Sequence, residues 1–277
     1  MNQKKKILFL DLDGTLLNDA KEITPGNMAA IREALRQGHK IVITSGRATV
    51  SALTFAEKMS LDSEGCYAIT YNGACIYDLF HKKPIYRKTL PVAVVRHILE
   101  AAEKAGLYAH TYTKTAVLSA HNTRELLSYT TATTMQYLIT DDVCGALPEE
   151  PEKVIVIELD DPQRLHDFQA SLSEWADGKV DSFYSCPNYL EYMPVGVSKG
   201  SAIKIFCEMF DLPLKNTISA GDADNDIPML EATHISAIMK NAESSMYAHG
   251  NYVTEHDNNH DGIAEIIYKF ILTKGKD

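Results

Sequence analysis

The sequence predicts an α/β fold: a doubly wound parallel sheet that is interrupted by an inserted α+β domain. Near both ends of the chain, short apolar runs alternate with helical periods, and several of the apolar runs end in polar residues. Between about residues 78 and 198 this rhythm gives way to short strands separated by helices. We therefore place the core at residues 1–83 and 190–277 and the inserted domain at residues 84–189.

Composition narrows the class of protein. The chain has 277 residues, 45% of them hydrophobic, and a net charge of −10, which would repel nucleic acids and anionic membranes. No apolar segment approaches the roughly 20 residues of a membrane helix, and no signal-peptide core follows the N-terminal lysines. The five cysteines are odd in number and form no C-x-x-C pair, which favours reduced thiols over disulfides or structural zinc. We expect a cytoplasmic protein.

The first strand ends in two carboxylates. Residues 7–10 are apolar and follow three lysines, which predicts a strand buried on both faces with Asp11 at its carboxyl end. In an extended chain residues two apart point the same way, so Asp11 and Asp13 would converge, and Gly14 would allow a sharp turn. Two carboxylates that close favour a bound divalent cation, although a turn closed by aspartates is the simpler alternative.

The next elements bring further polar groups to the same edge. Thr24 and Pro25 begin a helix that ends at Gly38, and residues 39–44 form the next strand. A strand, a helix and a strand with short joints make a right-handed crossover between parallel strands. This second strand ends in Thr44-Ser45-Gly46-Arg47, and a third, residues 66–70, ends in Tyr71-Asn72-Gly73.

The remaining elements follow from the same reading. In the inserted part we predict strands at 85–88, 108–113, 116–119, 154–159 and 180–184 and helices at 91–105 and 162–175, whereas 130–151 has no clear period. In the second part of the core we predict helices at 199–210 and 262–272 and strands at 217–220, 234–238 and 252–254. Strand 217–220 is followed at once by Gly-Asp-Ala-Asp-Asn-Asp.

These polar groups predict a cation site. In open parallel sheets ligands bind outside the carboxyl ends of the strands, where the candidates are Asp11, Asp13, Ser45, Asn72, Asp222, Asn225 and Asp226. Oxygen ligands without histidine suit magnesium rather than zinc. An EF-hand loop that begins at Asp222 is excluded, because it would need a glycine where the sequence has Ile227 and a glutamate where it has Thr233. A P-loop is excluded because no G-x-x-x-x-G-K-[ST] occurs.

Four motifs together resemble those of the haloacid dehalogenase-like hydrolases. They are Asp11-Leu12-Asp13-Gly14-Thr15, Thr44-Ser45-Gly46-Arg47, Val197-Ser198-Lys199-Gly200 and Gly221-Asp222-Ala223-Asp224-Asn225-Asp226. Their order, and the long insertion between the second and third, resemble the Cof-type sugar-phosphatase branch with a type 2B α/β cap. The segments Tyr71-Asn72-Gly73-Ala74, Met239-Lys240-Asn241-Ala242 and Asp261-Gly262-Ile263-Ala264 are similar to that branch as well.

The resemblance implies a magnesium-dependent phosphatase. Asp11 would attack phosphorus to form an aspartyl-phosphate, and Asp13 would act as general acid and base. Lys199 and Ser45 would contact the phosphoryl oxygens, and Asn225 and Asp226 would be outer ligands. The implied sets are catalytic Asp11, Asp13, Ser45 and Lys199, substrate-binding Ser45, Gly46, Arg47, Asn72, Lys199 and Asn225, and metal-binding Asp11, Asp13 (through its carbonyl), Asp222 and Asp226.

Several alternatives stay open from sequence. Thr44 competes with Ser45 as the phosphate-binding hydroxyl, and turn or salt-bridge roles are equally plausible for Asn72 and Arg47. Asp224 is interpreted as surface charge. The expected partner is a small phosphorylated metabolite, with neither nucleic acid nor membrane, and the oligomeric state is open. A phosphomutase and a catalytically weak protein that binds a phosphorylated ligand are the alternative functions.

Overall fold

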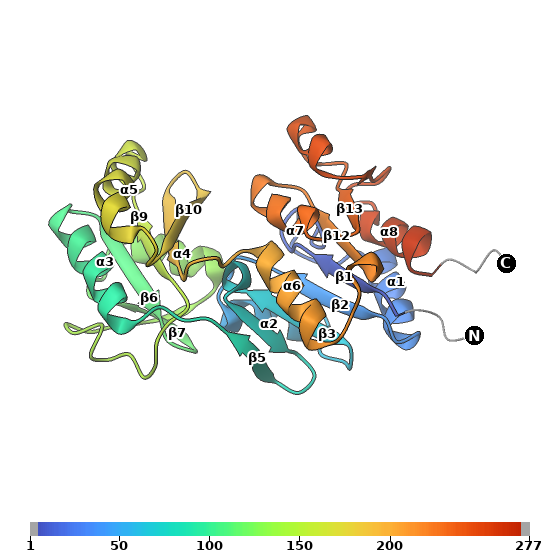
Figure 1. The fold of residues 1–277 in the computed structure, drawn as a ribbon, viewed down its shortest axis with the longest axis horizontal. Helices are drawn as coiled ribbons and strands as arrows, with labels where there is room; N and C mark the ends of the chain where they lie inside the picture. The colour runs from blue at the N-terminus through green and yellow to red at the C-terminus, as the bar shows by residue number, and fades with distance from the viewer. Residues whose placement is uncertain (1–4, 273–277) are drawn as a thin grey trace. The chain divides into compact units, whose positions relative to one another are not determined.

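The structure is a computed structural model that describes residues 5–272. Its contacts divide the chain into two compact units, which we describe one at a time (Figure 1). The first unit contains the residues up to Ser45, Ala52–Ile85 and the residues from Ser198 onward. The second contains Gly46–Ser51 and Tyr86–Val197.

The first unit is built on an eight-stranded sheet. Its order is β14-β13-β12-β1-β2-β3-β4-β5, and the pairs from β14 to β3 are parallel, whereas β4 runs antiparallel to β3. The strands are β1 (Ile7–Leu10), β2 (Lys40–Thr44), β3 (Cys66–Thr70), β4 (Cys75–Asp78), β5 (Lys83–Arg87), β12 (Thr217–Gly221), β13 (Ile235–Ile238) and β14 (Tyr252–Val253). β1 lies inside this sheet between β2 and β12 and is buried on both faces, as its apolar sequence predicts.

Helices cover both faces of this sheet, which confirms the predicted fold class (Figure 1). The helices are α1 (Pro25–Arg36), α2 (Thr49–Lys58), α6 (Lys199–Met209), α7 (Ile227–Glu231) and α8 (Gly262–Phe270), with 3-10 turns η1 (Tyr71–Gly73), η2 (Leu214–Asn216), η3 (Asp224–Asp226) and η4 (Ser244–His249). Side chains of α1, α2 and α8 join Leu8, Leu10, Ile41 and Ile43 in one apolar core.

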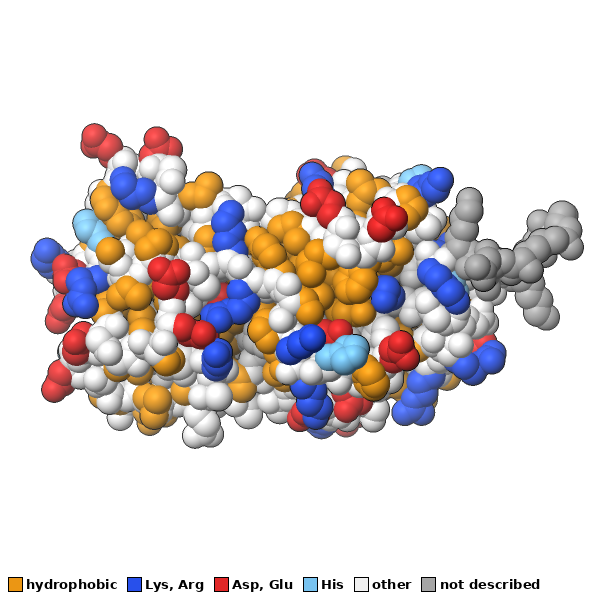
Figure 2. All heavy atoms as spheres, turned by 60° about the horizontal axis from the view of Figure 1, so that its bottom comes forward, with side chains coloured by type: hydrophobic (Ala, Val, Ile, Leu, Met, Phe, Trp, Pro, Cys, Tyr) orange, Lys and Arg blue, Asp and Glu red, His pale blue; other side chains and the backbone are white. Residues whose placement is uncertain are grey.

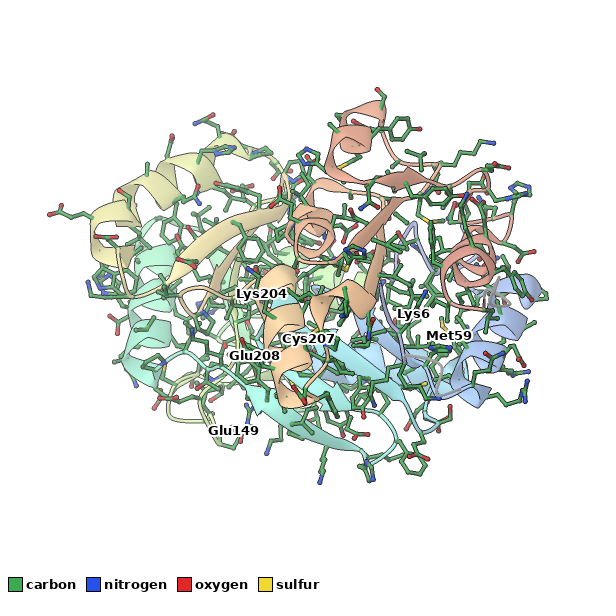
Figure 3. The ribbon with its side chains drawn as sticks, turned by 45° about the vertical axis from the view of Figure 1, so that its right-hand side comes forward. Lys6, Met59, Glu149, Lys204, Cys207 and Glu208 are labelled. Carbon is green, nitrogen blue, oxygen red and sulfur yellow. The ribbon has the colours of Figure 1, made fainter. Side chains whose placement is uncertain are left out.

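Helix α6 packs on the opposite face. The ring of Phe206 lies edge-on to Phe9, with 5.7 Å between centroids, and to Tyr67, with 5.0 Å. Cys207 is buried on the same helix, whereas Lys204 and Glu208 are exposed (Figure 3). This alternation is the helical period that the sequence predicts for residues 199–210.

The second unit is an α+β module. Its six-stranded sheet has the order β10-β11-β9-β6-β7-β8, antiparallel except between β7 and β8. The elements are α3 (Val92–Lys104), β6 (Tyr108–Tyr112), β7 (Ala116–Ser119), α4 (Arg124–Thr133), β8 (Gln136–Ile139), β9 (Val154–Ile157), α5 (Gln163–Ala176), β10 (Asp181–Cys186) and β11 (Tyr189–Met193). Apolar residues of α3 and α5 pack with Val154, Val156 and Leu190 of the sheet.

Some elements differ from the sequence prediction. Helix α4 and strands β4, β8 and β11 were not predicted. β8 is exposed at all four positions, so it lacks the alternation of buried and exposed residues that marks a half-buried strand. Because β11 pairs with β9 and β10, residues 190–197 group with the second unit and not with the core as drawn from sequence.

The surface carries both signs of charge. Basic and acidic side chains are interspersed on the face drawn in Figure 2. All five cysteines are free thiols, and only Cys186 is partly exposed. Within residues 5–272, no helix is both long enough and apolar enough to cross a bilayer.

Candidate active site

Asp11 lies directly after β1, at the carboxyl edge of the first unit's sheet. Its N–H donates to the carbonyl of Ala220 at 3.1 Å, which holds it beside the end of β12, and the residue is only 8% exposed. The chain then leaves the extended conformation, because the N–H of Leu16 donates to Asp11 O at 3.2 Å and that of Leu17 to Leu12 O at 2.8 Å. Asp11 is therefore fixed at the start of a tight loop.

Lys199 is delivered by the first turn of α6. Ser198 caps this helix: its Oγ accepts the Ser201 N–H at 3.0 Å, and its own N–H donates to Ser201 Oγ at 2.9 Å. The lysine side chain is 1% exposed, and its Nζ lies 2.6 Å from both Asp11 Oδ1 and Asp226 Oδ1. The ammonium thus joins two of the predicted motifs directly.

The loop after β12 places Asp222 and Asp226. Asp226 is fully buried, and its Oδ2 accepts the N–H groups of Asp222 at 3.0 Å and of Ala223 at 3.3 Å. Asp222 Oδ1 accepts the hydroxyl of Thr15 at 2.7 Å. Asp226 therefore orients both Lys199 and the backbone of Asp222, and Thr15 orients the Asp222 carboxylate.

These groups form a carboxylate cluster. Asp11, Asp222 and Asp226 each offer an oxygen, and the three atoms lie within 4.8 Å of one another. Within residues 5–272, the ammonium of Lys199 is the one that pairs with carboxylates of this cluster. Three carboxylates with one lysine leave an excess of negative charge on oxygen ligands, which is the donor set that a hard divalent cation such as Mg²⁺ prefers. The residues present therefore fit the metal that the resemblance implies.

The electrostatics agree with a cation site. Burial, and next the charge of Asp226, raise the pKa of Asp11 despite the nearby Lys199. Burial likewise raises the pKa of Asp222 to about 6. For Lys199 burial acts to lower the pKa, but the charges of Asp11 and Asp226 outweigh it and hold the pKa above its ordinary value.

We expect Mg²⁺ affinity to fall as pH decreases from about 8 to about 5. Because the pKa values of Asp11 and Asp222 are raised, protons occupy these carboxylates more fully at the lower pH and must leave when the metal binds. Titration calorimetry at both pH values, in two buffers of different ionisation enthalpy, measures the affinity and the protons released. Equal affinities without proton release would contradict this reading.

Asp13 does not follow the expectation of convergence. Its carboxylate contacts Lys21 Nζ at 2.7 Å, and its side chain is 41% exposed, whereas the cation cluster consists of Asp11, Asp222 and Asp226. Asp11 and Asp13 were expected to point the same way because residues two apart do so in an extended chain. The backbone instead bends right after Asp11, and Asp13 forms an isolated bridge with Leu17. Its predicted roles, general acid and base and metal binding through its carbonyl, do not require its carboxylate to lie in the cluster.

Ser45 and Asn72 lie close together at neighbouring strand ends. The Asn72 N–H donates to Ser45 O at 3.1 Å, and the Ser45 N–H donates to Ile69 O at 2.9 Å. Thr44 is fully buried, and its hydroxyl has no hydrogen-bond partner within residues 5–272. The choice between Ser45 and Thr44 as the phosphate-binding hydroxyl stays a prediction.

The turn that carries Asn72 is strained. Tyr71, Asn72 and Gly73 have φ values of 49°, 52° and 114°, although the first two are not glycine and are buried. Each such residue costs about 1–3 kcal/mol, and strain of this kind clusters at functional sites. A Cβ on Gly73 would lie 2.2 Å from the carbonyl oxygen of Ser198, so the turn packs closely against the start of α6.

The other predicted substrate-binding residues are Gly46, Arg47 and Asn225. Gly46 and Arg47 group with the second unit, where the Gly46 carbonyl accepts a hydrogen bond from Lys153 Nζ at 3.2 Å. Asn225 is exposed in η3. Their substrate-binding roles stay predictions.

Sequence reasoning missed two contacts of this site. Thr15 was quoted in the first motif without a role, yet it hydrogen-bonds Asp222. Lys21 was not singled out, yet it pairs with Asp13. The position of Thr15 directly after Gly14 was a usable signal, whereas nothing in the pattern marked Lys21.

The chain is similar to known proteins along almost its whole length. A sequence model for haloacid dehalogenase-like hydrolases matches residues 8–267. A protein of Streptococcus pyogenes serotype M6, which carries a provisional phosphatase name without a substrate, is 30% identical over 96% of this chain and 98% of its own. The pyridoxal phosphate phosphatase of Escherichia coli is 26% identical over 96% of this chain and 99% of its own.

Solved structures agree. A haloacid dehalogenase-like hydrolase from Bacteroides thetaiotaomicron is 28% identical and superposes with a TM-score of 0.88, covering 95% of this chain and 98% of that one. The family model matches most of the chain, and the four motifs occur in the expected order. Residues from three of these motifs meet in one cluster. Together these findings assign the chain to a family. The protein belongs to the haloacid dehalogenase-like hydrolase family, Cof-type branch, and is a phosphomonoester hydrolase.

Proposed function

We propose that this protein is a Mg²⁺-dependent phosphatase of small phosphorylated metabolites that works through an aspartyl-phosphate on Asp11. The observation that carries the proposal is the Lys199 ammonium, which lies 2.6 Å from Asp11 and 2.6 Å from Asp226, with Asp222 in the same cluster. Such a site combines a nucleophilic carboxylate with groups that offset the charge of a phosphate dianion.

In the first step Asp11 attacks phosphorus, the bond from phosphorus to the leaving oxygen breaks, and Asp13 gives its proton to that oxygen. In the second step Asp13 takes a proton from water while the water oxygen attacks the phosphorus of the aspartyl-phosphate. The bond to Asp11 then breaks, and inorganic phosphate leaves.

The residues around Asp11 would offset the negative charge of the phosphate. Mg²⁺, held by Asp11, Asp222 and the carbonyl of Asp13, would supply positive charge that offsets the repulsion between carboxylate and phosphate. Lys199 would donate to the phosphoryl oxygens as a point charge, and Ser45 would add a neutral hydrogen bond. Asp226 would keep Lys199 aligned through the contact described above.

The substrate class rests on the relatives. Those relatives include a pyridoxal phosphate phosphatase and a 5-amino-6-(5-phospho-D-ribitylamino)uracil phosphatase, both 26% identical to this chain. A small phosphomonoester is their common feature, and we extend it to this chain. The domain assignment belongs to the proposal too: the first unit would carry the chemistry and the second would act as the cap. Free cysteines are typical of a reducing compartment, which supports a cytoplasmic location.

Phosphate release from a panel of phosphomonoesters tests the proposal. The panel holds hexose phosphates, pyridoxal 5′-phosphate, the ribitylaminouracil phosphate and nucleotides, each assayed with Mg²⁺, after chelation, and after Mg²⁺ is restored. We expect free phosphate from at least one small substrate, lost on chelation and regained with Mg²⁺. Release of no phosphate, formation of an isomerised sugar phosphate instead, or indifference to chelation would overturn it.

A further inference from the structure

The loop that follows Asp11 is held by side-chain amides from a distant part of the first unit. The loop runs from Asp13 to Asp19, and the amides belong to residues more than two hundred positions later in the chain. Three contacts to loop backbone atoms make the link: Asn241 Nδ2 to Gly14 O at 2.7 Å, Asn258 Nδ2 to Leu17 O at 3.0 Å, and Asp19 N to Asn259 Oδ1 at 3.1 Å. We call these three asparagines the amide clamp.

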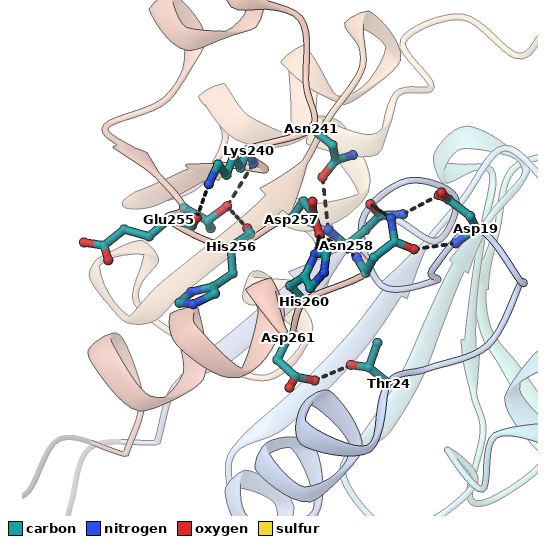
Figure 4. A network of polar contacts seen from close by, with 12 residues as sticks. Asp19, Thr24, Lys240, Asn241, Glu255, His256, Asp257, Asn258, His260 and Asp261 are labelled. Atoms are coloured by element: carbon teal, nitrogen blue, oxygen red, sulfur yellow. Dashed lines mark hydrogen bonds and ion pairs between the residues drawn. The ribbon is translucent and has the colours of Figure 1, made fainter.

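The amide clamp is connected within itself. Asn241 Oδ1 accepts the N–H of Asn258 at 3.1 Å, so one side chain binds the loop with its donor and the next clamp residue with its acceptor (Figure 4). Asn258 is only 4% exposed, and its Nδ2 also lies 3.3 Å from Asp19 Oδ1. A shift of one clamp residue would therefore be passed to the next.

The clamp is tied to the backbone that carries Asp222. Asn241 lies two residues after Met239, whose N–H donates to Gly221 O at 3.0 Å. On the loop side, Thr15 donates to Asp222 Oδ1. The two backbone segments that meet at the cation cluster are thus linked twice, once through Thr15 and once through Asn241.

Close packing makes the position of this loop critical. Gly14 has a φ of 78°, and a Cβ built on it would lie 2.3 Å from Asp222 Oδ2. The Gly14 carbonyl that Asn241 holds belongs to the peptide that leads into Thr15. If this peptide rotates or moves by a fraction of an ångström, the Thr15 hydroxyl loses its alignment with Asp222.

We propose that Asn241 and Asn258 are positioning residues for the phosphatase reaction: they hold the Gly14–Thr15 peptide so that Asp222 and the Asp13 carbonyl stay aligned. Only the expected change in kcat/KM rests on the proposed function. Neither asparagine is assigned a contact with substrate. Outer partners of metal ligands typically change metal affinity or activity by about 10- to 100-fold.

The test compares Asn241→Ala with a matched control, Asn251→Ala. Asn251 makes the same kind of paired contact in the first unit, with Nδ2 donating to His234 O at 2.9 Å and Oδ1 accepting the Ser236 N–H at 3.0 Å. Both side chains are exposed, so each variant should fold, and the two side-chain hydrogen bonds of the control go to residues outside the loop. Asn259→Ala, also exposed, removes the link to Asp19 and serves as a second loop variant.

Amide hydrogen exchange without metal is the first readout. Losing the hydrogen bond from Asn241 to the Gly14 carbonyl, worth about 1.4 kcal/mol, should speed exchange at Leu16 and Leu17 by about 10-fold in Asn241→Ala, with no change in Asn251→Ala. The second readout is Mg²⁺ affinity by calorimetry, expected to weaken about 10-fold. The third is kcat/KM, expected to fall about 10- to 100-fold in Asn241→Ala and less than about threefold in the control. Asn259→Ala should shift all three in the same direction by less.

The outcomes separate this inference from the proposed function. If the wild type hydrolyses phosphomonoesters but Asn241→Ala matches Asn251→Ala in loop exchange and Mg²⁺ affinity, the clamp has no positioning role. If the wild type releases no phosphate, the proposed function fails, while the exchange and Mg²⁺ measurements still decide the clamp. Faster loop exchange with unchanged Mg²⁺ affinity would overturn the positioning role, because the clamp would then serve only loop stability.

Discussion

Asp11→Asn is expected to lower phosphate release by about 10⁴-fold or more while leaving the protein folded. The amide has nearly the shape of the carboxylate, but it cannot attack phosphorus and carries no charge for the cation. Lys199 keeps its contact with Asp226, so no ammonium is left without a partner. Burial disfavours the charged form of Asp11, so the free energy of unfolding should change by less than about 1 kcal/mol.

The matched control for this change is Asp224→Asn. Asp224 is exposed in η3, close in sequence to Asp222 and Asp226, and its substitution by asparagine removes the same charge as Asp11→Asn. Its turnover should stay within about threefold of the wild type. Steady-state phosphate release and urea unfolding measure both variants. Equal activity of Asp11→Asn and Asp224→Asn would show that Asp11 is not the nucleophile.

Lys199→Met is expected to damage activity and stability together. The side chains have similar length, but the substitution leaves two carboxylates 2.6 Å from where the ammonium was, in a buried site. Breaking a buried ion pair by removing one partner costs about 3–5 kcal/mol. Losing the point charge on the phosphoryl oxygens should lower kcat by about 10²- to 10³-fold.

The stability deficit has a defined pH dependence. Without Lys199 the pKa of Asp11 loses its main lowering influence and rises further, so the folded variant binds a proton that the unfolded chain has released. Stability should therefore continue to fall with rising pH above about 8, the value to which the pKa of Asp11 is raised while Lys199 is present, and saturating Mg²⁺ should recover part of it. Lys204→Met, on an exposed position of the same helix, is the control (Figure 3). A Lys199→Met protein as stable and active as Lys204→Met would contradict the assigned role.

The sequence was sufficient to predict the parallel strands of the first unit's sheet and the meeting of Asp11 with Asp222 at their carboxyl ends. Short apolar strands with short crossovers allow few topologies, and in a parallel sheet every strand presents its carboxyl end at the same edge. β1 and β12 are neighbours, so the residues just after them had to lie close together. Asp226 was already among the candidates at the strand ends, whereas Lys199 followed from the family resemblance and not from spacing, because nothing in the pattern of residues 199–210 says where the first side chain points.

Contacts within irregular segments could not be predicted in this way. The bend after Asp11, the pairing of Asp13 with Lys21 and the amide clamp depend on hydrogen bonds between loops, which leave no period in the sequence. Helix α4 and strand β8 were also missed because they lie in or beside residues 130–151, where the sequence has no clear hydrophobic period.

The stereochemistry of the reaction at phosphorus tests the central claim most directly. A phosphomonoester made chiral at phosphorus is turned over by the wild type, and the configuration of the transferred phosphoryl group is determined. Each in-line displacement inverts phosphorus, so attack first by Asp11 and then by water predicts overall retention. Overall inversion would mean that water attacks the substrate directly, and Asp11 would then not be the nucleophile.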